Sequence, residues 1–113
     1  HSTLEKAVWR LLVHNLAVAY GMTGDLARAK TTLDYGLSRD PANSLFHYHL
    51  ARTYAGMNDR EKAMQSLHAA FRNDRQRETD DRIPDPRQDV SFRRFMLDPT
   101  FRDLAESLMQ PAI

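Results

Sequence analysis

The sequence predicts an all-α protein in which helical hairpins stack into a short solenoid. A shift of 34 residues brings apolar residues, a tyrosine and two aspartates onto identical residues. Apolar residues also recur at three- and four-residue steps, as on one face of a helix, and glycines and prolines interrupt the chain between these runs. A period of this length is typical of helix-turn-helix repeats, whose usual work is binding. The matching pairs are Leu16 and Leu50, Ala17 and Ala51, Tyr20 and Tyr54, Asp25 and Asp59, Ala29 and Ala63, Leu33 and Leu67, and Asp40 and Asp74.

The first unit contains two predicted helices. Ser2 and Glu5 have the spacing of a capping box, which predicts a helix start at Thr3. Glycines at 21 and 24 end this helix, and Asp25 caps a second one over about 26–38. The dipeptide Asp40-Pro41 closes the unit, because proline disfavours helix at the residue before it. The first helix carries the apolar residues Leu4, Val8, Leu11, Leu12, Leu16, Ala19 and Tyr20.

The second unit repeats this plan. Asn43 or Ser44 can cap a helix that ends near Gly56, and Asn58-Asp59 forms the turn to the next helix. That next helix carries an apolar stripe at Ala63, Leu67, Ala70 and Phe71. Each unit is therefore an antiparallel helical hairpin with a very short connection.

The remaining third of the chain is irregular. Residues 73–89 hold many charges and two prolines, with Ile83 as the only large apolar residue, which predicts a loop. Asp89 can then cap a short helix, and Asp98-Pro99 is a strong signal for another helix start. We expect Pro111 to end the last helix. The short helix carries Val90, Phe92, Phe95 and Met96, and the last one carries Phe101, Leu104, Ala105, Leu108 and Met109.

These motifs resemble the tetratricopeptide repeat (TPR) family over about residues 10–75. The first copy is Val13, Leu16-Ala17, Tyr20, Gly24-Asp25, Ala29, Leu33, Gly36 and Pro41; the second is His47, Leu50-Ala51, Tyr54, Asn58-Asp59, Ala63, Leu67 and Ala70. Two departures are His47, where the family has a large apolar residue, and Arg75, where it has the closing proline. The resemblance implies a short right-handed α-solenoid, and the tail is similar to the irregular caps of such arrays. Since about three repeats are needed for stability, we expect the tail to supply the third layer.

The expected organisation is a single TPR-like domain over 1–113. Its parts are an extension of the first helix (1–9), repeat 1 (10–43), repeat 2 (44–75), a charged loop (76–88) and a helical cap (89–113).

Composition and motifs exclude several classes of function. Sixteen basic residues face fifteen acidic ones, and the arginines of the loop are nearly cancelled by carboxylates, so we expect no nucleic-acid partner. There is no cysteine, no histidine pair with metal-ligand spacing and no catalytic motif. We therefore predict no enzyme activity, no catalytic residues, no metal and no cofactor. The longest uncharged run is fourteen residues, too short to cross a bilayer, and no secretory leader is visible. The compartment stays open, with the cytoplasm favoured.

The resemblance implies a concave groove lined by the first helix of each unit. The residues placed there are Leu11, His14, Val18, Leu45, Tyr48 and Arg52. Such a surface suits a peptide or protein segment with apolar anchors and an acidic group for Arg52. The alternative is that some of these residues pack against the neighbouring layer or the tail. A carboxylate clamp for chaperone tails is disfavoured. The positions of its lysine and two asparagines are occupied here by His14, Val18 and His49, so none of the three matches.

The first helix is apolar nearly all round, which predicts cover on more than one side. Between residues 7 and 20 only Arg10, His14 and Asn15 are strongly polar. Either upstream repeats or a second chain would pack there, and folding back of the tail helix is the alternative. The second functional hypothesis is thus an assembly element that homodimerises or docks on the rest of its own chain. A third makes the domain the regulatory appendage of an enzyme. The contact residues expected are Leu4, Val8, Trp9 and Leu12.

Overall fold

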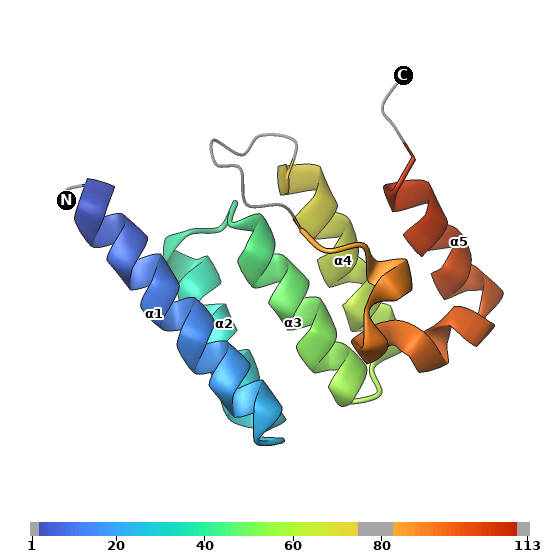
Figure 1. The fold of residues 1–113 in the computed structure, drawn as a ribbon, viewed down its shortest axis with the longest axis horizontal. Coiled ribbons are helices and arrows are strands. Elements are labelled where there is room, and N and C mark those ends of the chain that lie inside the picture. Colours follow the sequence, from blue (N-terminus) through green and yellow to red (C-terminus); the bar gives the residue numbers. More distant parts are fainter. Residues whose placement is uncertain (1–2, 75–82, 111–113) are drawn as a thin grey trace.

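The computed structural model describes residues 3–74 and 83–110, which form a row of helical layers (Figure 1). Ser2 of the predicted capping box, residues 75–82 of the predicted loop and Pro111 lie outside the described residues. No helix in the described part is long and apolar enough to cross a membrane. The elements are α1 (Thr3–Met22), α2 (Leu26–Arg39), α3 (Ser44–Gly56), α4 (Arg60–Asp74), the 3-10 helices η1 (Pro86–Gln88) and η2 (Val90–Leu97), and α5 (Pro99–Leu108).

The two hairpins have the same kind of turn between their helices, as the 34-residue repeat predicts. Gly24 and Asn58, which are 34 residues apart, both have a positive φ, +81° and +61°. Asp25 then caps α2 by accepting from the backbone N–H of Arg28, and Asp59 accepts from that of Lys62 at the start of α4. Gly and Asn tolerate the left-handed conformation better than other residues. The turn chemistry therefore repeats with the sequence.

Small residues let the helix backbones approach closely. Ala29, Ala51 and Ala63 are completely buried. At Gly36 a Cβ atom would lie 2.9 Å from the ring of Phe46, which is itself buried. A side chain at position 36 would force α2 and α3 apart, because Gly36 lies on α2 and Phe46 on α3.

The tail supplies the third layer, as predicted. Phe92 and Phe101 are completely buried, and they join Tyr48 and Leu67 of the second hairpin in one apolar core cluster. Asp98 caps α5 by accepting from the backbone N–H of Thr100, and its side chain also pairs with Arg60 at the start of α4. The predicted Asp98-Pro99 helix start is therefore confirmed.

Three details of the tail differ from the prediction. Ile83 is buried in the core, although the sequence places it in a solvated loop. Residues 86–88, also predicted as loop, form a 3-10 turn capped by Asp85. Val90 is 66% exposed, because the 3-10 geometry of η2 turns Phe92 and Phe95 to the core and leaves Val90 outside.

Candidate protein-binding groove

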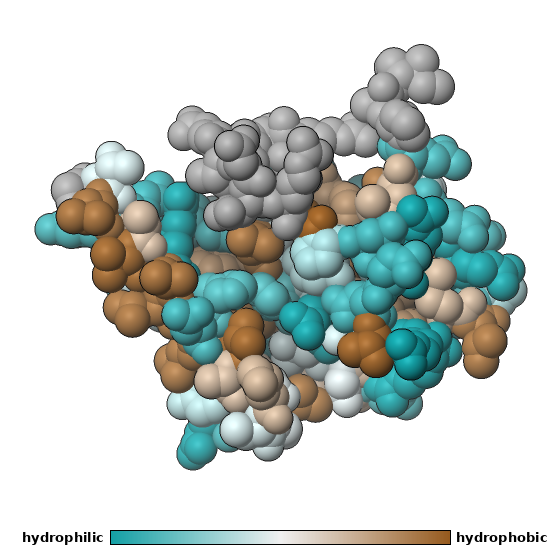
Figure 2. Space-filling view, viewed as in Figure 1, coloured by the Kyte–Doolittle hydropathy of each residue, from teal (hydrophilic) through white to brown (hydrophobic). Residues whose placement is uncertain are grey.

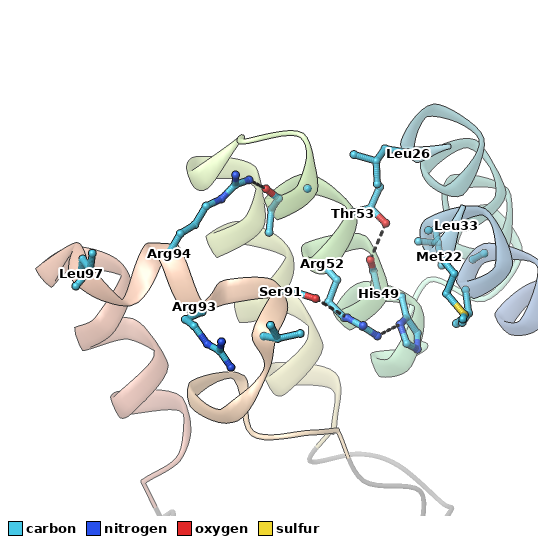
Figure 3. A pocket seen from close by; sticks show the side chains of 16 residues that line it. Met22, Leu26, Leu33, His49, Arg52, Thr53, Ser91, Arg93, Arg94 and Leu97 are labelled. Atoms are coloured by element: carbon cyan, nitrogen blue, oxygen red, sulfur yellow. Dashed lines mark hydrogen bonds between the residues drawn. The ribbon is translucent and has the colours of Figure 1, made fainter. Parts of the chain in front are cut away.

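A groove of about 790 Å³ runs between the first hairpin and the cap. Buried Ala17, Leu33 and Ala55 form part of its floor. Met22 stands on the side of the first hairpin and Leu97 on the side of η2, as Figure 3 shows. A volume of this size is typical of a ligand-binding cavity.

Among the described residues, three arginines and no carboxylate line this groove. Arg52 of α3 donates from Nε to the Ser91 hydroxyl at 3.1 Å, and the same nitrogen lies 3.5 Å from an Asp89 carboxylate oxygen. Arg93 and Arg94 leave η2 in different directions, and Arg94 donates to the Ala55 carbonyl at the end of α3 (Figure 3). The groove is therefore apolar with a basic lining.

A buried polar link attaches the cap to the second hairpin. The Tyr48 hydroxyl donates to Asp89 at 2.6 Å. Burial, with the hydrogen bond to Asp89 and its charge, raises the pKa of Tyr48 well above its usual range. Burial alone would raise the pKa of Asp89, but the hydrogen bonds from Tyr48 and the Ser91 backbone, with the charge of Arg52, hold it below its usual value. Asp89 is therefore an anion that ties η2 to α3.

Two histidines connect α1 and α3 beside the groove. The rings of His14 and His49 meet edge to face with their centroids 4.6 Å apart. Burial, together with the nearby His14 and Arg52, lowers the pKa of His49 to about 4. His49 is therefore neutral at pH 7, and the arginines carry the positive charge of the groove.

The groove predicted from the sequence is only partly the groove of the structure. Val18 and Arg52 line it, and His14 adjoins it through His49. Leu11 and Leu45 are not among its lining residues. Tyr48 needs a correction: it is completely buried beneath the chain's own tail, so a partner cannot reach it.

The sequence prediction missed most of the groove's outer wall. Met22, His49 and the η2 residues Val90, Arg93 and Leu97 all line it. One signal was available for the arginine pair 93–94. The flanking residues 92 and 95 are phenylalanines, and burial of both leaves the residues between them facing solvent.

The outer face of α1 is an exposed apolar stripe, defined by Leu4, Val8, Leu11, Leu12 and Leu16. Figure 2 shows apolar residues along this edge of the molecule. Trp9, which was predicted with this contact surface, is half-buried and packs its ring on Phe46 and Tyr35 with centroids about 6 Å apart. Of the four predicted contact residues, three are therefore exposed, and Trp9 packs within its own fold.

The described residues contain no candidate metal site. Within residues 3–74 and 83–110, no three His, Cys, Asp or Glu side chains converge on a point.

The family model described as tetratricopeptide repeat matches residues 12–80. No curated protein and no solved structure matches the chain significantly.

Proposed function

The chain belongs to the tetratricopeptide repeat family, and from this premise we propose that it binds a segment of another protein in the groove between the first hairpin and η2. The family generally provides protein–protein interaction modules. The observation that carries the proposal is the exposure of large apolar side chains on both sides of the open groove: Met22 is 83% exposed and Leu97 is 86% exposed. Exposed apolar groups gathered in this way are typical of interaction sites.

A peptide-display selection on the folded chain tests this proposal. Peptides that bind should lose at least tenfold in affinity when Met22→Glu or Leu97→Glu places a charge on a groove wall. Leu4→Glu is the matched control, because Leu4 is 74% exposed on the apolar stripe and does not line the groove. Circular dichroism of each variant checks that the fold is kept. Selected peptides that bind all three variants equally would refute the groove as the binding site.

A second candidate function is assembly through the exposed apolar stripe. Leu12 and Leu16 are 63% and 48% exposed, whereas their repeat equivalents Phe46 and Leu50 are 1% and 7% exposed. In α3 that face is covered by the preceding hairpin, and Phe46 packs against Gly36 of α2. The same face of α1 is thus of the kind that a further helical layer covers, from a second copy or from another part of the protein.

Light scattering over a wide concentration range tests the dimer. Self-association through this face predicts an average mass that rises with concentration and a Leu12→Glu/Leu16→Glu variant that stays monomeric. Met22→Glu, which changes the groove, is the control and should still associate. A monomer at every concentration would exclude the dimer.

A further inference from the structure

We propose that the groove recognises an acidic segment of its partner, in which one or more carboxylates lie beside apolar side chains. The inference rests on the proposed function, since it names the chemistry of the partner in that same groove. It depends on the distribution of charge around the cavity and on the composition of its walls.

The positive charge of the groove is local and only partly balanced: Arg52 lies 3.5 Å from Asp89, whereas Arg93 and Arg94 form no ion pair with the residues that the structure describes. The whole chain has a formal net charge of only +1, yet within residues 3–74 and 83–110 three arginines and no carboxylate line the cavity. Arg93 is exposed and has no carboxylate or hydrogen-bond partner among the residues that the structure describes. Elsewhere in the described part of the chain, four arginines are paired with carboxylates: Arg10 with Asp40, Arg28 with Asp25, Arg60 with Asp98 and Arg87 with Asp85.

Two of the three guanidinium groups are held in position before a partner arrives. Arg52 is anchored through its Nε to Ser91, and Arg94 is anchored to the Ala55 carbonyl. Each anchored group keeps further N–H donors, because a guanidinium has five. A carboxylate can therefore be received with little loss of side-chain entropy.

The walls favour a peptide over nucleic acid. Apolar side chains stand on both sides of the arginines, with Met22 on the first hairpin and Val90 and Leu97 on η2. No phenylalanine, tyrosine or tryptophan is among the described residues that line the cavity, so nucleic-acid bases would find no aromatic side chain there to stack on. Arginine paired with carboxylate supplies orientation, and the apolar side chains supply buried area.

Two labelled peptides test whether the groove prefers a segment with carboxylates. One is an amphipathic peptide of leucine and glutamate, and the other carries glutamine in place of every glutamate. Fluorescence anisotropy on the full chain should show at least tenfold tighter binding of the glutamate peptide. Its affinity should fall as the salt concentration is raised from about 0.1 M to about 1 M, because the Debye screening length shortens from about 10 Å to about 3 Å.

Charge reversal at Arg93 locates the contact. Arg93→Glu should weaken the glutamate peptide at least tenfold, and Arg93→Lys should weaken it less, since the charge remains. Arg102→Glu is the matched control, because Arg102 is an exposed arginine of α5 that does not line the groove and should keep wild-type affinity.

Each other outcome overturns the inference. Equal binding of the two peptides, an unchanged affinity in Arg93→Glu, or no binding of the glutamate peptide would refute the acidic partner. Tighter binding of a labelled oligothymidine would assign the arginines to nucleic acid instead. The two proposals can fail separately: display-selected peptides that lack carboxylates and lose binding in Met22→Glu would support the groove as the binding site and refute only its preference for acidic segments.

Discussion

Acidification from pH 7 to pH 4 should destabilise this fold through one residue, His49. The ring lies between α1 and α3, in edge-to-face contact with His14, and Arg52 and Asp89 are the charged groups that act on it from α3 and from the cap. The negative charge of Asp89 favours protonation, but burial, His14 and Arg52 oppose it more strongly. The folded state therefore holds His49 neutral, whereas the unfolded chain protonates it at its ordinary value.

The magnitude follows from the two pKa values. A folded pKa of about 4, against an ordinary value of 6.5, corresponds to about 3 kcal/mol, since each pH unit of difference is worth about 1.4 kcal/mol. Folding lowers the pKa of this basic group, and this sets the sign of the pH dependence of stability. Between pH 6.5 and 4 the unfolded chain binds more protons, so the free energy of unfolding decreases as the pH falls. Asp40, Asp85 and Asp89, whose pKa values lie below their usual range, remove stability only below about pH 4.

Urea titrations followed by circular dichroism at pH 7, 6, 5 and 4.5 measure this effect. The wild-type midpoint should fall by roughly 1 M or more across the series, given a urea dependence of about 1–3 kcal/mol per molar. His49→Gln removes the titrating ring and should flatten the dependence. His68→Gln, at an exposed position on α4, is the matched control and should keep the wild-type slope. A wild-type midpoint that does not change over this range would refute a neutral His49 in the folded state.

Two further pairs of substitutions test the packing. Gly36→Ala should destabilise the chain by about 1–2 kcal/mol, because the new Cβ would lie 2.9 Å from the Phe46 ring. Gly21→Ala is the control: nothing lies within 4 Å of its new Cβ, so it should stabilise the chain by up to about 1 kcal/mol. If the urea midpoints of both variants shift in the same direction, the close approach of α2 to α3 is contradicted. Phe92→Ala should cost about 3–5 kcal/mol, because Phe92 is completely buried, and exposed Val90→Ala should change the free energy of unfolding by less than about 0.5 kcal/mol; a small effect of Phe92→Ala would show that the tail is not part of the core.

The repeat itself is predictable because its determinants are local. The left-handed turn at Gly24 and Asn58 and the caps at Asp25 and Asp59 each depend on residues within one helical turn of each other. The same holds for the start of α5 at Asp98. Backbone preferences and capping act over three or four residues, so a single sequence reveals them.

The groove was only half predictable, because its second wall comes from a distant segment. The 34-residue period places Tyr48 at the position equivalent to His14, and the resemblance to the tetratricopeptide repeat family implied that both line one concave surface. The cap breaks this equivalence: it covers Tyr48 through Asp89 and leaves His14 beside the cavity. Contacts between residues about 40 apart in the chain follow no local pattern.

The sequence by itself thus determined the architecture: two helical hairpins with equivalent turns, small residues at the close approaches, and a first helix that is apolar nearly all round. The tertiary structure decided which surfaces are available. Burial of Phe92 and Phe95 places η2 over α3, which removes Tyr48 from the surface and brings Arg93 and Arg94 to the edge of the groove. The physical reason is that helix formation depends on neighbours in the chain, whereas a groove depends on which distant apolar side chains share one core.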